Sequence, residues 1–313
     1  MQFPPALTNA LAQLLDGVSR KDLAAAAQKL SAGYRQGATS HGIATPLDAK
    51  AYAVARMPAT YAACAAVFAR LTKVMPDFAP ASLLDVGAGT GAASWAAITA
   101  WPGIGAVIML DRNPALRDLA RKLADAGPMP DLEILIGDVT AAKPKADLLV
   151  ASYVLAEFAQ ERAAAVAVDL WESAGAALVL IEPGTPDGFA RIRAARAALI
   201  AAGAHVAAPC THDKECPMHA PDWCHFSQRL PRSRDHMLLK DANVPFEDER
   251  YSYVVVTREK VASGARILAP PLEEKPGLTF KLCDENGLRA QFVAARDKNE
   301  YRRVRKHGWG DLF

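Results

Sequence analysis

This 313-residue chain lacks several features that would place it in a broad class at once. No apolar run reaches membrane-spanning length without charges or prolines, so we expect no membrane segment. The N-terminus, Met-Gln-Phe-Pro-Pro, has no basic signal-peptide start and no arginine-rich amphipathic pattern. We therefore expect neither a secretory signal nor a transit peptide, and a cytoplasmic location. The net charge of only +2 gives no global basic field that would indicate nucleic acid.

Cysteine is also scarce, with five residues in all, which is an odd number. In a reducing compartment, clustered cysteines are ligands more often than disulfides. Cys210, Cys216 and Cys224 form a C-x5-C-x7-C run, and Cys283 follows in the C-terminal part. Cys64 lies in an alanine-rich helical stretch, where we expect a small buried apolar residue.

The cysteine run lies in a proline-rich stretch, residues 208–226, with little apolar periodicity, so something other than a core must hold it. Four cysteines could complete a tetrahedral sulfur site for zinc or bind an iron–sulfur cluster. The spacing lacks the two-residue knuckle of common zinc ribbons, which weakens zinc. A histidine could replace one cysteine as a zinc ligand, and three lie nearby: His212, His219 and His225. Zinc therefore stays an alternative, although ordinary surface or supporting roles are favoured for these histidines.

The hydrophobic fraction of 51% allows one large domain with additions, or two domains. We expect three regions: a helical N-terminal region over 1–80, a cofactor-binding domain over 81–263 with a cysteine-rich insertion at about 208–240, and a β-extension over 264–313 with a basic tail.

The middle region alternates short apolar strands with helices. Strands are expected at 82–86, 106–110, 132–136, 147–152, 177–181 and 251–257, with a possible further strand at 205–207. Helices are expected from 92, from 114, over about 157–173 and over about 186–202. This alternation is typical of an α/β doubly wound sheet. Residues 278–282 and 288–293 are expected to pair across 284–287.

A glycine-rich turn, Asp85-Val-Gly-Ala-Gly-Thr-Gly91, lies between the first strand and its helix. Glycines let the backbone approach a ligand closely, and the free amides of the helix start attract negative or polar groups. Asp111 ends the next strand, where an acid bonds the ribose hydroxyls of a nucleotide.

Two cofactors fit this turn. Gly87-x-Gly89-x-x-Ala92 satisfies the dinucleotide fingerprint, so a nicotinamide cofactor stays an alternative. The acid before the first glycine and the G-x-G-x-G spacing resemble the first motif of class I S-adenosylmethionine (SAM) methyltransferases, which have a Rossmann-like fold. That resemblance implies SAM binding in the following way: Asp85, Gly87, Gly89 and Gly91 surround the methionine part, Asp111 holds the ribose, Asp138 lies beside the adenine, and Ser152 and Tyr153 border the methyl-transfer site.

Catalytic residues are harder to assign. The Asp/Asn-Pro-Pro-aromatic motif of amine-methylating enzymes is absent, because residues 151–157 read Ala-Ser-Tyr-Val-Leu-Ala-Glu. Pro209-Cys210 superficially resembles a motif of cytosine C5 enzymes but lies after the fifth helix. Glu157 and Glu182 are weak candidates for a base, and each has a plainer interpretation, as a helix-start acid and a loop acid.

Read together, several stretches resemble the Rsm-twenty-two family, also called methyltransferase-like seventeen. They are Tyr52-Ala-Val-Ala-Arg-Met-Pro-Ala-Thr-Tyr61, the glycine turn, Ala208-Pro-Cys-Thr-His-Asp213, Cys224-His-Phe-Ser-Gln-Arg229, Tyr251-Ser-Tyr-Val254 and Trp309-Gly-Asp-Leu-Phe313. The resemblance implies a methyltransferase-like protein that acts in assembly or translation on small-subunit ribosomal RNA. It also implies a [4Fe–4S] cluster on Cys210, Cys216, Cys224 and Cys283.

Two functional classes follow: an RNA methyltransferase, or a binding and assembly factor in which SAM and the cluster are structural. A small-molecule or protein methyltransferase is a third, weaker option. Residues 228–234 are basic, and the segment from Arg289 to Phe313 contains seven basic residues and three acidic ones. These stretches could contact RNA phosphates or could simply be solvated surface.

Overall fold

The computed structural model describes residues 2–35, 42–127, 129–261 and 263–313. Its centre is a twisted sheet in the order β3-β2-β1-β4-β5-β8-β6, with β7 paired to β8. The first five strands in this order are parallel, whereas β8 runs antiparallel to both β5 and β6. The bounds are β1 Ser82–Val86, β2 Ala106–Asp111, β3 Asp131–Ile136, β4 Ala146–Ser152, β5 Ala174–Pro183, β6 His205–Ala208, β7 Phe226–Pro231 and β8 Phe246–Thr257.

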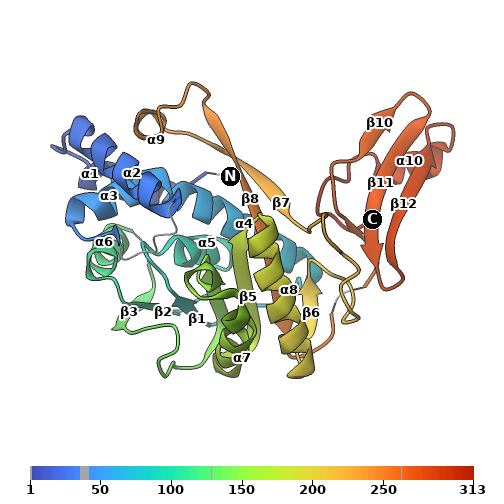
Figure 1. Cartoon of the computed structure of the whole chain (residues 1–313), viewed down its shortest axis with the longest axis horizontal. Coiled ribbons are helices and arrows are strands. Elements are labelled where there is room, and N and C mark those ends of the chain that lie inside the picture. The colour runs from blue at the N-terminus through green and yellow to red at the C-terminus, as the bar shows by residue number, and fades with distance from the viewer. Residues whose placement is uncertain (1, 36–41, 128, 262) are drawn as a thin grey trace.

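Helices cover both faces of this sheet (Figure 1). The helices of the domain are α5 Ala92–Ala100, α6 Pro114–Asp125, α7 Ala163–Ser173, α8 Pro186–Ala201 and the short α9 Arg234–Leu239. Neighbouring strand residues divide between two buried clusters: Leu83 packs on the side of α5, and Leu84 packs on the side of α7 and α8. Strands buried on both faces explain the near-continuous apolar runs in the sequence. The Rossmann-like α/β sheet is confirmed.

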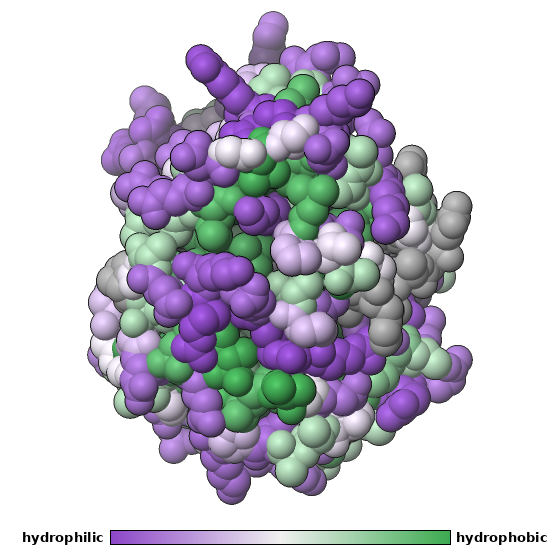
Figure 2. Space-filling view, turned by 90° about the vertical axis from the view of Figure 1, so that its left-hand side faces the viewer, coloured by the Kyte–Doolittle hydropathy of each residue, from purple (hydrophilic) through white to green (hydrophobic). Residues whose placement is uncertain are grey.

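The N-terminal region is helical, as expected. It contains α1 Pro5–Leu14, α2 Arg20–Arg35, α3 Pro46–Ala55 and α4 Met57–Val74. Thr45 caps α3 in a capping box with Asp48, whose carboxylate accepts from the Thr45 N–H at 2.9 Å. Cys64 on α4 is fully buried, as the sequence predicts. The sequence also predicts a polar break from Gly33 to Pro46 between the helical stretches, and its residues 36–41 lie outside the described residues. Figure 2 looks onto this side of the molecule, where hydrophilic residues surround scattered apolar patches.

The C-terminal part forms a separate small sheet beside the main one (Figure 1). It contains β9 Arg266–Ile267, β10 Leu272–Glu274, β11 Gly277–Asp284 and β12 Gly287–Ala294, followed by α10 Lys298–Val304. The expected hairpin across 284–287 is confirmed by the antiparallel pairing of β11 and β12. Its own apolar cluster includes Ile267, Phe280 and Leu282, which explains how so small a unit keeps its shape.

One local prediction was wrong, and two further elements had no prediction. The helix expected from Glu157 begins at Ala163, after two short 3-10 turns, η2 Leu155–Glu157 and η3 Gln160–Arg162. The basic stretch 228–234, interpreted above as RNA-contacting or solvated surface, lies largely in β7, because residues 226–231 pair with 246–251 of β8. The basic tail contains the helix α10, which the pattern did not predict.

Candidate functional site

The glycine turn lies where β1 ends and α5 begins. Gly87, Gly89 and Gly91 have φ values of +68°, +57° and +79°, a region that residues with a side chain rarely adopt. A Cβ on Gly87 would also come within 2.5 Å of the Val154 side chain. The turn therefore needs glycine for conformation and, at Gly87, for space.

Two buried carboxylates frame this turn. The Asp85 Oδ2 atom accepts hydrogen bonds from the Ser94 N–H at 3.0 Å and from the Ser94 hydroxyl at 2.7 Å, whereas Oδ1 has no partner. Burial raises the pKa of Asp85 to about 6. The Asp111 carboxylate accepts from the Gly89 N–H at 2.8 Å and from the Asn113 N–H at 2.7 Å. The turn and the end of β2 are thus joined directly.

The other residues predicted for SAM lie along the same edge of the sheet. Asp138 follows β3 and accepts from the Thr140 N–H at 3.1 Å and from Arg112 at 3.3 Å. Ser152 ends β4, and Tyr153 follows it. Because parallel strands end together, Asp85, Asp111, Asp138 and Ser152 meet at the carboxyl edge, where ligands bind in doubly wound sheets. The unpartnered Asp85 oxygen and the glycine turn are compatible with a polar ligand there.

Sequence reasoning missed a polar network behind this edge. Tyr153 has a φ of +61°, a strained value for a residue with a side chain. Its hydroxyl donates to Glu249 Oε1 at 2.7 Å, and the same carboxylate pairs with Arg56 at 3.6 Å. Burial raises the pKa of the Tyr153 hydroxyl well above its ordinary value. Arg56 lies in one of the stretches that carry the family resemblance, but Glu249 had no local signal.

The two candidate bases are both engaged in structure. Glu157 pairs with Arg112 at 3.0 Å. Glu182 is fully buried, and its Oε1 atom accepts from the Leu155 N–H at 2.7 Å, which fixes the 3-10 turn after β4. Burial raises the pKa of Glu182 to about 8, so its carboxyl is mostly protonated at pH 7.

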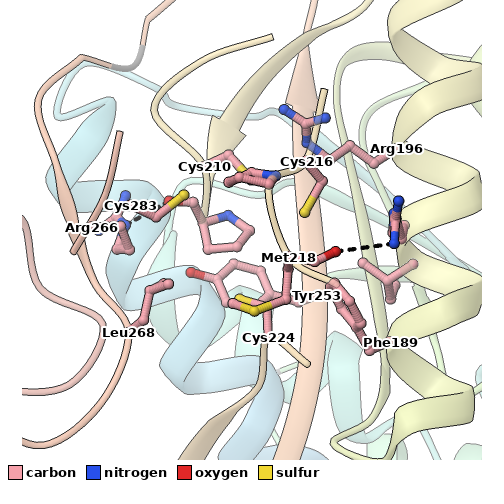
Figure 3. A pocket seen from close by; sticks show the side chains of 14 residues that line it. Phe189, Arg196, Cys210, Cys216, Met218, Cys224, Tyr253, Arg266, Leu268 and Cys283 are labelled. Carbon is pink, nitrogen blue, oxygen red and sulfur yellow. Dashed lines mark hydrogen bonds between the residues drawn. The ribbon is translucent and has the colours of Figure 1, made fainter. Parts of the chain in front are cut away.

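The four cysteines, far apart in sequence, line one cavity (Figure 3). Cys210 follows β6, Cys216 lies in the loop, Cys224 precedes β7, and Cys283 lies on β11. Burial, reinforced by the neighbouring thiols, raises the pKa of Cys224 well above its ordinary value and that of Cys283 to about 12. Metal coordination would reverse this, because a coordinating thiol is deprotonated.

A single-ion site is not formed by these thiols. Within the described residues, no three His, Cys, Asp or Glu side chains form a group that could hold a metal ion. A zinc ion with bonds of about 2.3 Å to sulfur would need sulfurs roughly 4 Å apart. None of the three nearby histidines lines the cavity. His219 is exposed, and His225 stacks on Trp223. His212 is buried outside the cavity, with its Nε2 atom 3.9 Å from the Cys283 sulfur.

Comparison with known proteins identifies the family. The model of a family described as "Mitochondrial small ribosomal subunit Rsm22" matches residues 46–313, which is most of the chain. The chain belongs to the Rsm22 family. The family resemblance of the sequence is thereby confirmed. The printed description of this family refers to the small ribosomal subunit of mitochondria.

Relatives of this Rsm22-family chain include a human protein named "Ribosome assembly protein METTL17, mitochondrial", 29% identical over 84% of this chain and 61% of the relative. The "Rsm22-cox11 tandem protein 2, mitochondrial" of Schizosaccharomyces pombe is 28% identical over 94% of this chain and 46% of the relative. The chain thus spans about half to three fifths of these relatives.

Solved structures give only distant likenesses. A putative RNA methyltransferase of Pyrococcus horikoshii is 15% identical with a TM-score of 0.41, over 62% of this chain and 83% of its own. The magnesium protoporphyrin IX methyltransferase of Synechocystis with bound SAM is 17% identical with a TM-score of 0.42, over 64% and 80%. Neither likeness supports an inference, and the fold of the Rsm22-family chain rests on its strand order.

The basic stretches differ in how their charges are used. In 228–234, Arg229 pairs with Asp248 at 2.8 Å and Arg232 with Glu247 at 3.0 Å, so much of that charge is neutralised. Around α10, Arg303 pairs with Glu300. Within the described part of the chain, the exposed Arg296, Lys298, Arg302, Arg305 and Lys306 have no carboxylate partner. The α10 region is therefore the better candidate for a phosphate-binding surface.

No helix among the described residues is long and apolar enough to span a membrane.

Proposed function

We propose that this chain is an assembly or translation factor of the small ribosomal subunit. In this proposal it binds ribosomal RNA through the α10 region, holds SAM at the glycine turn, and carries a [4Fe–4S] cluster on Cys210, Cys216, Cys224 and Cys283. The family membership supports the ribosomal part of the proposal. The named relatives are mitochondrial proteins, so the cytoplasmic location expected from this sequence stays a prediction.

The preference for a binding role rests on one observation: both candidate bases already serve the fold. Glu157 is in an ion pair, and Glu182 is fully buried, has a raised pKa and accepts from the backbone N–H of Leu155. A general base must reach a proton on the substrate. Ribosomal RNA methylation is the second candidate, and the strained Tyr153 in contact with Glu249 favours it, because backbone strain gathers at active sites.

The residues present are compatible with both absent groups. SAM would supply a methyl group when bound; Asp111 would accept from its ribose hydroxyls, and the free Oδ1 of Asp85 is an unused acceptor beside the turn. Four thiols line one cavity, which is the ligand set that a four-cysteine cluster would use.

Ribosome binding is tested by measuring the affinity for purified small subunits at several salt concentrations. Each phosphate contact contributes nearly one to the slope of log affinity against log salt. We expect Arg302→Gln with Arg305→Gln to weaken binding and to reduce this slope by about two. The matched control is Arg229→Gln, which removes an exposed arginine already paired with Asp248. An unchanged slope in the double variant would show that the α10 region does not contact RNA phosphates.

Methyl transfer separates the two candidates. The protein is incubated with isotopically labelled SAM and small subunits at matched occupancy. Binding of SAM without incorporation of label supports the assembly role. The opposite result would be incorporation of label by the wild type and its loss in Tyr153→Phe, with SAM binding retained. That result would replace the assembly role with RNA methylation.

A further inference from the structure

Two arginines are buried beside the cysteines. Arg196 on α8 is 5% exposed and Arg266 on β9 is 3% exposed, and both line the same cavity as the four thiols. Figure 3 shows them on different sides of the space that the cysteines surround. Charged side chains are rarely buried so fully unless they are paired.

Both arginines donate to backbone carbonyls, and Arg196 also interacts with the Cys210 side chain. Arg196 Nη2 donates to the carbonyls of His212 at 2.7 Å and Lys214 at 2.9 Å. Arg266 donates from Nε to Pro209 O at 2.6 Å and from Nη1 to Gly310 O at 2.9 Å. The Nε atom of Arg196 and the Nη2 atom of Arg266 have no partner.

Little negative charge reaches this environment. No aspartate or glutamate lines the cavity, and within the described residues neither arginine is in a salt bridge. The Asp311 carboxylate has a longer-range electrostatic interaction with Arg266, but its ion pair, at 3.4 Å, is with Lys73. A guanidinium stays charged in proteins, so the fold holds two positive charges beside four thiols that are neutral when protonated. Burying uncompensated charge is costly, and carbonyl dipoles offset only part of that cost.

We propose that Arg196 and Arg266 are the counter-charges of the metal–thiolate group: they retain it in the cavity and set its reduction potential. The inference rests on the cluster proposed above. Four thiolates around an oxidised four-iron core leave two negative charges, which two guanidinium groups neutralise. One-electron reduction adds a third negative charge. Loss of either arginine therefore destabilises the reduced form more than the oxidised form, and lowers the potential.

The test uses full-length protein prepared without oxygen. The variants are Arg196→Met and Arg266→Met, which remove the charge, and Arg196→Lys and Arg266→Lys, which keep it but lose the fork of donors. The control is Arg258→Met. Arg258 donates to the carbonyls of Trp171 at 2.9 Å and Ala174, but it is exposed, stacks on Trp171 and lies away from the cavity. The measurements are iron and sulfide per chain and the potential from a redox titration of the visible spectrum.

We expect each methionine variant to hold less iron and sulfide, and its remaining cluster to titrate at a lower potential. The expected shift corresponds to at least a tenfold lower ratio of reduced to oxidised cluster, or about 59 mV for one electron. The lysine variants and Arg258→Met should stay near wild type in potential. Wild-type potential and iron content in both methionine variants would overturn the role of the arginines and leave the cluster standing. Wild-type protein without iron and sulfide would overturn the cluster itself.

Discussion

Glu182 offers a test of how the buried edge of the sheet is held together. Its side chain is fully buried, Oε1 accepts from the Leu155 N–H at 2.7 Å, and Oε2 has no partner. Burial raises its pKa from the ordinary value of 4.5 to about 8. The folded protein thus keeps a proton that the unfolded chain releases as the pH rises above about 4.5. Stability should therefore fall with rising pH between these two values.

The size of the effect follows from the two pKa values. One pH unit of differential protonation corresponds to about 1.4 kcal/mol, so Glu182 should lower the free energy of unfolding by on the order of 3 kcal/mol between acid and pH 7. The loss should reach roughly 5 kcal/mol above pH 8, with water entry reducing it. Glu182→Gln keeps the acceptor for Leu155 and cannot ionise, so it should not show this loss.

The assay is urea unfolding followed by circular dichroism at each pH from 5 to 9. The quantity of interest is the difference in unfolding free energy between Glu182→Gln and wild type, because other titrating groups cancel in it. This difference should move in favour of the glutamine variant as the pH rises. Glu161→Gln, an exposed glutamate in the nearby η3, is the matched control and should follow wild type. Parallel curves for Glu182→Gln and wild type would refute the argument that Glu182 is buried as a neutral acid.

Three further outcomes are expected. Cys216→Ser should lose iron and loosen the C-terminal sheet, measured by metal analysis and proteolysis, whereas Cys64→Ala should keep its iron; equal iron in both variants would contradict the ligand role. Gly87→Ala should destabilise the protein by about 1–3 kcal/mol or more in thermal unfolding, because of its positive φ and the contact with Val154; an unchanged melting temperature would show that the turn relaxes freely. Asp111→Asn should weaken SAM binding at least tenfold by calorimetry, and unaltered affinity would exclude it from the ribose site.

The sheet was predictable because its signals are local. Short apolar strands, capped helices and the glycine turn can each be recognised from a few consecutive residues. The parallel arrangement of the strands then brings Asp85, Asp111 and Asp138 to one edge of the sheet. The cysteines were also found from spacing and composition. What the sequence could not give was their surroundings, since Cys283 reaches the loop only through the packing of the small sheet.

Two features that the sequence did not reveal, β7 and the network around Tyr153, depend on partners distant in the chain. Residues 226–231 contain a proline and several polar residues, and they form a strand because 246–251 pairs with them. Pro231 is tolerated because it stands at the end of β7, the strand off the main path of the sheet. The Tyr153–Glu249–Arg56 network joins three separate regions of the chain, so no window of sequence could show it.

Arg196 is different, because a local signal was present. On α8 the apolar residues Ile192, Ala195 and Leu199 are buried, and Arg196 lies on the same face at helical spacing from Ile192 and Leu199. A basic residue at a core-facing position of an amphipathic helix must find a counter-charge or hydrogen-bond acceptors. Read together with the cysteine loop that begins soon after this helix, that position indicates that negative charge belongs in the loop. The thiolates of a bound metal group would provide it. The position of Arg196 therefore pointed to acceptors in the cysteine loop, and the structure supplies two of them, the carbonyls of His212 and Lys214.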